Sequence, residues 1–440
     1  MRRFFVFILL FSFFGLSVSA QHANSPYSRF GVGDLLSPQS VASHGIGGIG
    51  VSYFNPVSVN VSNPALLTAN TLTAFEGAGS VEEKILSAPN GEQRDFLGNL
   101  DYLAFSFPIS RKMRLGMGLQ GYSRVNYENI VFEKVEGSDR FAEYNYSGNG
   151  GITQAHVSTA WEPFSGFSVG AQAFYNFGRT ENKSASRILG GDFIFSDVGQ
   201  IDAIQLNDRV NYSDFSFKFG AFYRYQLPNL TYLNVGVTYE PQTDISATRF
   251  RALESVNYRN AVIERDTIVT TESLAPRLPE RLTFGFMVQK PINEAGRSRK
   301  PTTYALGAEI SWQDWTQTND VNFAGSLKEQ FRVSVGGEIT PNIVDATASY
   351  LNKITYRAGY HYDQTPFAPG GDQFIEQGVS LGFSMPNPKP SNRFQSFSRL
   401  HLAFTYGQRN FTDVDYSETF YRVRLGLTVQ QPWFYRRRYD

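Results

Sequence analysis

Residues 41–65 read VASHGIGGIGVSYFNPVSVNVSNPA and come directly before a long series of alternating segments. The closely spaced glycines and the Asn-Pro steps at 55–56 and 63–64 oppose both a long helix and a regular strand. The stretch also contains many Ile and Val residues, too many for a linker that lies in solvent. We therefore expect a compact, irregular plug around which the rest of the chain folds.

From residue 72 onward, large apolar residues alternate with small or polar ones at the period of two that is typical of β-strands. In 302–314, Leu306 and Ile310 share one face, whereas Glu309 lies on the other. The pattern predicts fourteen strands, an even number, as is usual for a single-chain bacterial barrel. We place them at about 72–82, 98–107, 112–131, 142–161, 166–184, 208–226, 230–246, 280–289, 302–314, 329–340, 353–363, 376–385, 397–409 and 418–430.

A membrane barrel explains this alternation better than a secreted β-sandwich. In lipid, the apolar face points outward, the polar face lines the lumen, and closure leaves no unpaired strand edge. Aromatic residues make up 15% of the chain, with 38 Phe and 24 Tyr, which fits aromatic girdles at the membrane interfaces. The sequence therefore predicts an all-β transmembrane antiparallel barrel of about 14 strands, with the plug in its lumen. Four tryptophans near strand ends are expected to be interface anchors: Trp161, Trp312, Trp315 and Trp433. The alternative for Trp315 is that it lines a ligand site.

The N-terminus predicts export. Arg2 and Arg3 precede an apolar run from Phe4 to Leu16, and small residues at 18–20 form a signal-peptidase site. The chain has no cysteine, so a lipid anchor at the cleavage point and disulfides are excluded. We expect a signal peptide at 1–20, a lead-in and plug at 21–70, and a barrel at 71–440 in the outer membrane of a Gram-negative bacterium.

Several motifs together resemble the FadL family of outer-membrane transporters for hydrophobic compounds. The glycine-rich run ends in Asn63-Pro64-Ala65 just before the first strand, as the N-terminal hatch of that family does. Three later stretches resemble family motifs in the same order: 278–285 (LPERLTFG), 309–315 (EISWQDW) and 357–366 (RAGYHYDQTP). The resemblance spans most of the mature chain and implies a hatch inside a barrel. It does not extend to the outer loops, so it does not identify a substrate.

The hatch residues that we single out are Gly47, Gly48, Asn63, Pro64 and Ala65. Asn63-Pro64-Ala65 is either a movable element that opens a path or a rigid turn that seats the plug. The glycines lack the following lysine of a phosphate-binding loop, so we expect them to allow close packing in the lumen.

Charged residues occur on the polar faces of the predicted strands. They could bind a ligand carboxylate, although an internal ion network is the favoured interpretation. These residues are Arg281, Glu309, Arg332, Glu338, Arg357, Arg422 and Arg424. The five histidines are scattered without metal-ligand spacing and no Gly-Xaa-Ser-Xaa-Gly motif is present, so we expect no catalytic site, metal or cofactor.

The sequence favours uptake of hydrophobic or amphiphilic small molecules, such as long-chain fatty acids, by passive diffusion gated by the hatch. The alternative is a non-enzymatic shuttle or structural barrel in a protein secretion or assembly complex, like the PorV-type relatives of type IX secretion. The charged predicted loop 247–279 lacks an apolar lip, which mildly favours this alternative. Expected partners are outer-membrane lipid and either a hydrophobic ligand or a protein of such a complex. The net charge of 0 gives no indication of nucleic-acid binding.

Overall fold

The computed structural model describes residues 25–88, 91–189, 203–257, 261–290, 302–318, 326–342, 348–368, 373–387, 397–410 and 416–432. The signal peptide expected at 1–20 and the expected anchor Trp433 lie outside these residues.

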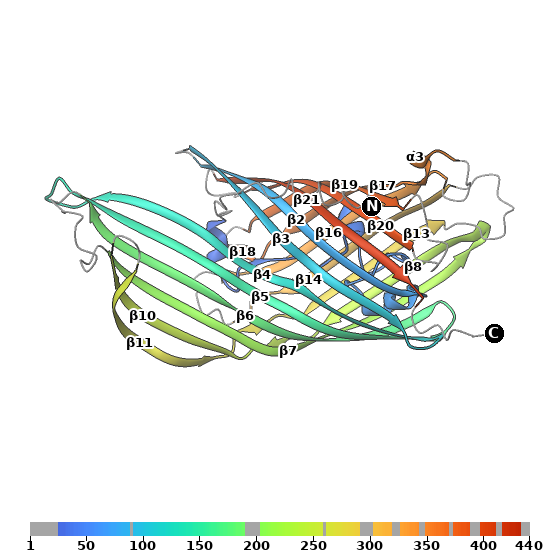
Figure 1. The fold of residues 1–440 in the computed structure, drawn as a ribbon, viewed down its shortest axis with the longest axis horizontal. Helices are drawn as coiled ribbons and strands as arrows, with labels where there is room; N and C mark the ends of the chain where they lie inside the picture. Colours follow the sequence, from blue (N-terminus) through green and yellow to red (C-terminus); the bar gives the residue numbers. More distant parts are fainter. Residues whose placement is uncertain are drawn as a thin grey trace, which may run out of the picture.

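The chain forms a closed antiparallel barrel of 14 strands, which confirms the predicted fold class (Figure 1). Each barrel strand pairs with the next, and the last strand pairs with the first, from Thr73 opposite Gln431 to Ser87 opposite Ser417. The barrel strands are β2 (Thr73–Ala88), β3 (Gly91–Pro108), β4 (Met113–Lys134), β5 (Phe141–Phe164), β6 (Phe167–Leu189), β7 (Ala203–Leu227), β8 (Thr231–Glu240), β13 (Arg281–Lys290), β14 (Thr303–Asp314), β16 (Glu329–Thr340), β17 (Thr355–Gln364), β19 (Ile375–Pro386), β20 (Phe397–Asn410) and β21 (Ser417–Gln431).

Burial follows the predicted alternation. On β14, the outward Leu306 is 67% exposed, whereas its neighbour Ala305 is 4% exposed and faces the lumen. Glu309 of the same strand is also buried, and the next residue, Ile310, is exposed. An exposed apolar outer face with a buried polar inner face is the arrangement that a bilayer requires.

The two ends of the barrel differ. At one end the described turns are short, as at 109–112, 165–166 and 228–230, where the three-residue turn is the 3-10 helix η4 (Pro228–Leu230). Short turns are typical of the periplasmic side of outer-membrane barrels. A further short helix, α3 (Tyr350–Lys353), precedes β17. None of the helices in the described residues is long and apolar enough to cross a bilayer.

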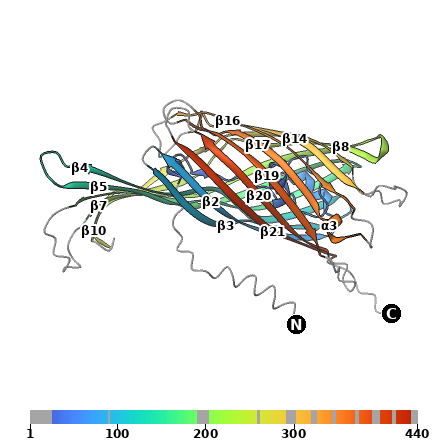
Figure 2. The same ribbon diagram turned by 90° about the horizontal axis from the view of Figure 1, so that it is seen from above.

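At the opposite end, a sheet extends well past the barrel (Figures 1 and 2). Residues 247–279, predicted to be a loop, instead contain β10 (Ala247–Val256) and β11 (Val262–Leu274), flanked by the two-residue strands β9 (Thr243–Asp244) and β12 (Arg277–Leu278). Residues 219–227 of β7, within the barrel wall, pair with β8. Residues 203–212 of the same strand, which lie past the barrel, pair with β10. We use the name extension sheet for β10 and β11 together with the parts of β4, β5, β6 and β7 that lie past the barrel.

Cross-strand ion pairs connect neighbouring strands of the extension sheet from β5 to β11. Their nitrogen–oxygen distances are 2.7–3.2 Å. The pairs are Arg187–Glu143, Arg209–Glu181, Arg251–Asp208 and Arg265–Glu254. Apolar residues of β10 and β11 do not recur regularly at a period of two, and this is why sequence periodicity missed the hairpin.

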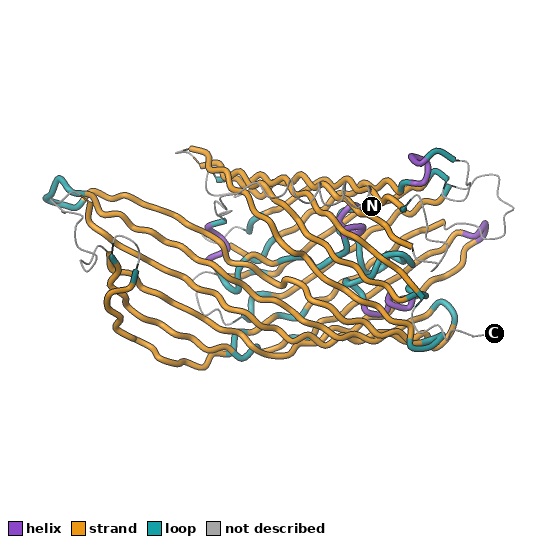
Figure 3. The backbone as a smooth tube through the Cα atoms, viewed as in Figure 1, coloured by secondary structure: helices purple, strands orange, loops and turns teal. Residues whose placement is uncertain are grey.

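Residues 25–72, which we call the N-terminal segment, lie within the cage of strands (Figure 3). They form η2 (Pro26–Arg29), β1 (Asp34–Leu35), α2 (Val41–Gly45) and η3 (Pro64–Ala69), joined by irregular chain. The Ser40 side chain accepts a hydrogen bond from the Ser43 N–H and so caps α2. All five residues of α2 are buried although the helix is far too short to be stable alone, so its contacts with the wall hold it in place.

Candidate functional site

The N-terminal segment lies against glycines of the wall. A Cβ atom added to Gly236 would lie 1.9 Å from the Val51 carbonyl oxygen, and one on Gly359 would lie 2.1 Å from the Gly47 nitrogen. One on Gly170 would lie 2.5 Å from the Ala65 nitrogen. The plug backbone therefore touches the wall backbone directly, and any larger residue at these wall positions would displace it.

Gly47 and Gly48 both adopt the left-handed backbone region, with φ of 77° and 95°. A Cβ on Gly47 would lie 2.7 Å from the carbonyl oxygen of Tyr360 in the wall. Close packing, as expected from the sequence, thus explains why position 47 is glycine. At position 48, the left-handed backbone conformation explains the glycine.

Asn63 ties three parts of the structure together. Its side-chain oxygen accepts a 3.0 Å hydrogen bond from the Ala65 N–H and caps η3, in which Pro64 is the first residue. Its side-chain amide donates to the carbonyl oxygens of Val51, at 2.9 Å, and Ala221 in β7, at 3.2 Å. The Asn63-Pro64-Ala65 turn therefore connects the two halves of the plug to the wall.

Three of the predicted charged residues bind the plug. Glu309 accepts hydrogen bonds from the backbone N–H groups of Gly50, at 2.7 Å, and Val51, at 2.8 Å. Glu338 accepts from the Tyr53 hydroxyl at 2.7 Å and from Arg357, which also donates to Tyr53 at 3.0 Å. Burial raises the pKa of Tyr53, which keeps its hydroxyl protonated and able to donate.

A second buried network holds the other side of the plug and was missed from the sequence. Glu76 accepts hydrogen bonds from the Val59 N–H, the Tyr102 hydroxyl and the Thr428 hydroxyl, at 2.9, 2.5 and 2.9 Å. His401 bonds to Thr428 at 2.9 Å. The available signal for Glu76 was a carboxylate on the inner face of the strand that follows the plug, a face that it shares with Glu82.

The same network contains a Ser–His contact. The Ser384 hydroxyl lies 2.5 Å from Nδ1 of His401, and Arg357 also donates to this hydroxyl. Ser384 is 0% and His401 1% exposed, and neither lines a described cavity of the lumen. A nucleophile needs substrate access, so this contact has the geometry of a structural tie between wall strands.

Two small cavities lie above the plug among the lumen residues that the structure describes. The larger has a volume of about 150 Å³ and the smaller about 90 Å³, and both are lined by residues 35–39 of the N-terminal segment. Arg332, Arg422 and Arg424 line the larger cavity, whereas Arg281, Glu309 and Arg332 line the smaller. Arg357 and Glu338 line neither, because they hold the plug.

The charged residues around these cavities pair with one another. Arg422 bonds to Glu82, Arg424 lies 3.7 Å from Asp101, and Arg332 lies 3.6 Å from Asp363. Arg281 bonds to Gln313 and lies 3.7 Å from Glu240. Lys84 and Arg409 reach Asp34 of the N-terminal segment at 3.8 and 3.2 Å. The charges around the two cavities are therefore largely neutralised by ion pairs, and some of these pairs also hold the N-terminal segment in place.

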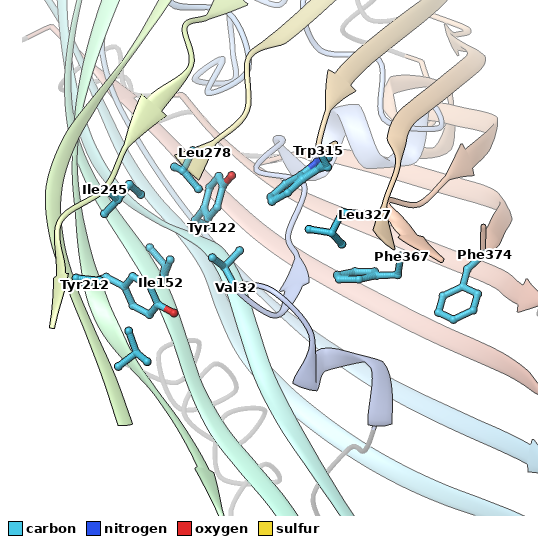
Figure 4. Packing of buried hydrophobic residues seen from close by; sticks show 12 residues of the cluster. Val32, Tyr122, Ile152, Tyr212, Ile245, Leu278, Trp315, Leu327, Phe367 and Phe374 are labelled. Atoms are coloured by element: carbon cyan, nitrogen blue, oxygen red, sulfur yellow. The ribbon is translucent and has the colours of Figure 1, made fainter. Parts of the chain in front are cut away.

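An apolar cluster, which we call the mouth cluster, lies beside the larger cavity (Figure 4). Trp315 is 2% exposed and lies with Leu327 across from Tyr122 and Val32. The prediction that Trp315 is an interface anchor was therefore wrong, because the chain after β14 turns inward. Two short strands, β15 (Ser326–Leu327) and β18 (Phe367–Ala368), pair within this cluster.

The N-terminal segment also lies along a strand edge in the wall. Register pairing of β3 with β4 ends at Tyr102 opposite Gln120, although both strands continue. Beyond this point β1 pairs with β4, with Asp34 opposite Arg124 and Leu35 opposite Ser123. The Leu36 N–H also donates to the Tyr122 carbonyl at 2.9 Å, so the chain covers this stretch of edge with its own residues.

Comparison with solved structures shows the same fold. The monoaromatic hydrocarbon channel CymD superposes with a TM-score of 0.57 at 16% identity, covering 91% of this chain and 99% of the channel. The toluene transporter TodX of P. putida gives 0.57 at 17% identity, with 90% and 98% covered. A FadL homologue of Pseudomonas aeruginosa gives 0.55 at 14% identity, with 91% and 99% covered. These identities establish the fold alone.

The sequence resemblance to FadL is therefore confirmed for the barrel fold of these outer-membrane channels. No curated protein matches the chain in sequence. The family is given by a family model described as BamG, which matches residues 1–440, the whole chain. This protein belongs to the BamG family.

Proposed function

We propose that this protein is a non-enzymatic outer-membrane barrel with a closed lumen, which serves as a structural or shuttle component of a protein secretion or assembly complex. The observation that carries the proposal is the charged lumen, in which residues 25–72 pack against the wall. Ion pairs surround its two cavities and the N-terminal segment fills the space between them. Outer-membrane lipid surrounds the apolar outer face.

The size and chemistry of the lumen support this role over ligand capture. Pockets that hold drug-sized molecules measure about 300–1,000 Å³ and are mostly apolar. The larger cavity here measures about 150 Å³, and its lining includes Glu82, Asp363, Arg409 and Arg422. Of the buried residues of the mouth cluster, Phe367 lines this space, whereas the others pack against one another. A hydrophobic ligand would have to displace charged pairs or packed side chains.

The extension sheet supports a protein partner. It presents a broad surface of paired strands beyond the barrel, on which cross-strand ion pairs lie among exposed apolar residues such as Phe132, Ile188 and Ile204. A broad surface that combines apolar and charged groups is typical of protein–protein interfaces and is not needed to hold a small apolar molecule.

Native mass spectrometry of the full chain, extracted from its own outer membrane in mild detergent, tests the proposal. We expect a protein partner at a fixed ratio and no stoichiometric long-chain amphiphile. A bound amphiphile on a barrel that carries no protein partner would overturn the assembly role.

The second candidate is uptake of hydrophobic small molecules, such as long-chain fatty acids, by passive diffusion. The observation that favours it is the covered strand edge, because a small number of hydrogen bonds hold the N-terminal segment along β4. Gly47, Gly48 and Asn63-Pro64-Ala65 would then belong to a hatch that moves. The solved structures with this fold include a toluene transporter, which is consistent with this candidate.

A reversible cross-link tests this second candidate, since the chain has no native cysteine. The double substitution Leu35→Cys and Ser123→Cys pairs residues that face each other between β1 and β4. If the segment moves during uptake, oxidation abolishes uptake of a fluorescent fatty acid and of toluene, and reduction restores it. The control pair Asn145→Cys and Ala185→Cys joins β5 to β6 in the extension sheet. Uptake that is the same in all forms would reject the moving hatch.

A further inference from the structure

The strand β11 leaves one edge open at the end of the extension sheet. It pairs with β10 along Val262–Leu274, and in the part of the chain that the structure describes no strand pairs with its other side. Figure 1 shows the β10–β11 hairpin at the margin of the sheet, away from the barrel. The edge therefore presents a row of backbone N–H and C=O groups to solvent.

This edge lies past the exposed aromatic residues of the neighbouring barrel wall. The hairpin pairs with residues 203–212 of β7, whereas the exposed aromatic residues Phe215, Phe217 and Phe219 lie further toward the barrel on the same strand. An open edge in hydrocarbon would be unstable, but in water it is free to accept another chain.

The sequence of β11 does little to protect this edge. Residues 267–271 read TIVTT, a window of β-branched residues without charge, proline or lysine. Such a window has a high propensity to pair with a further strand. Natural edge strands are more often blocked by lysine, proline or a covering loop.

Two uncompensated acidic residues on one face of β11 indicate the charge of the added strand. Glu264 and Asp266 are exposed, and their register partners on β10 are the uncharged Ser255 and Leu253. Within the described residues neither carboxylate has an ion-pair partner, whereas Arg265 between them is held by Glu254 at 2.7 Å. A strand added on the open side would place two of its side chains opposite these carboxylates, where basic residues are favoured.

We propose that the open edge of β11 binds an extended, basic segment of a partner protein, which adds to the extension sheet as a further strand. Backbone hydrogen bonds to 262–274 supply affinity, and lysine or arginine residues opposite Glu264 and Asp266 set the register. This inference rests on the proposed assembly role, because it names the surface at which the partner docks.

Peptide binding to the purified full-length barrel in detergent tests the inference. The probe is a fluorescent nine-residue peptide of alternating lysine and valine, and fluorescence anisotropy gives its Kd. A peptide of alternating glutamate and valine tests charge. A lysine–valine peptide with every backbone nitrogen methylated keeps the charge but cannot form a strand ladder. We expect both controls to bind at least tenfold more weakly.

Variants locate the site. The double substitution Glu264→Lys and Asp266→Lys should weaken binding of the lysine–valine peptide at least tenfold. The matched control Glu133→Lys and Asp139→Lys makes the same charge change near the tip of β4 and β5, where both residues are exposed, and should leave the Kd within twofold. Heat-modifiable gel mobility checks that each variant is a folded barrel.

Two results would overturn the inference: equal binding of the methylated peptide, or a Kd that the Glu264 and Asp266 substitutions do not change. Neither result bears on the assembly role itself. If native mass spectrometry still finds a stoichiometric partner on the Glu264→Lys, Asp266→Lys barrel, the role stands and the docking surface lies elsewhere.

Discussion

The plug and the extension sheet are stabilised by different means. At the plug, backbone meets backbone across wall glycines, and buried carboxylates such as Glu309 accept hydrogen bonds from plug N–H groups. In the extension sheet, partly exposed arginines pair with carboxylates across neighbouring strands. Tightly packed, buried hydrogen bonds are costly to break, whereas each exposed ion pair contributes little to the free energy of unfolding. The comparison therefore predicts that stability resides in the lumen and that the extension sheet is free to serve as a surface.

The largest effect is expected from Gly236→Val. The added side chain would overlap the Val51 carbonyl, so the plug cannot seat and the barrel loses more than about 3 kcal/mol of unfolding free energy. The control is Gly98→Val, because a Cβ on Gly98 meets no atom within 4 Å. Urea unfolding in lipid vesicles gives both values. Equal unfolding midpoints would mean that the plug does not depend on this contact.

The next effect is expected from Glu309→Ala. It leaves the N–H groups of Gly50 and Val51 without their acceptor, which costs about 1–3 kcal/mol for each group that stays buried. Loosening of the plug should also raise the permeability of proteoliposomes to a small polar antibiotic. The exposed Glu133→Ala serves as control. If Glu309→Ala is as stable and as tight as this control, Glu309 does not hold the plug.

A smaller, pH-dependent effect is expected at His44 of the plug. Burial lowers its pKa well below the usual value, and the charges of Arg424, Arg332 and Arg422 lower it further. The folded protein therefore holds His44 neutral, while the unfolded chain takes up a proton near pH 6.5. Stability from this group is present above pH 6.5 and falls below it, by at most about 1.4 kcal/mol per pH unit.

The substitution His44→Gln should remove that part of the pH dependence. The difference in unfolding free energy between wild type and variant should shift between pH 7 and pH 5 in favour of the variant. A constant difference across this range would show that His44 does not titrate differently on folding.

The smallest effect is expected from Arg187→Ala in the extension sheet. The Arg187 side chain is 39% exposed, and its pair with Glu143 is worth about 0–1 kcal/mol. The unfolding midpoint and its salt dependence should change little. A loss comparable to that of Glu309→Ala would erase the contrast between the two regions.

The sequence predicted the parts of the fold that lipid dictates. Alternation such as that of Leu306 and Glu309 follows directly from a wall with lipid on one side, so the strand number and the inner face could be read from it. The hairpin at 247–274 could not, because its apolar residues, such as Leu253, Ile263 and Ile268, do not recur regularly at a period of two along either strand. Trp315 was misplaced since the chain around it folds inward, which no local pattern records.

The sequence identified the charged residues of the candidate site, but it did not show which of them hold the plug and which line a cavity. Glu309, Glu338 and Arg357 hold the plug, whereas Arg422 and Arg424 surround a chamber, and the strands alone do not tell these roles apart. Glu76 was overlooked because its partners come from the plug, from β3 and from β21. Such partners become visible once the barrel closes.

The pairing of β2 with β21 has a consequence for how the barrel reaches its final form. This seam joins the first and last strands of the wall and so closes the barrel. Glu82 faces Arg422 and Glu76 faces Thr428 across it, all with inward side chains. A slip by one residue would turn these groups of one strand toward lipid, at a cost of several kcal/mol for each unpaired charge. The inward charges of the seam therefore favour closure of the barrel in a single register.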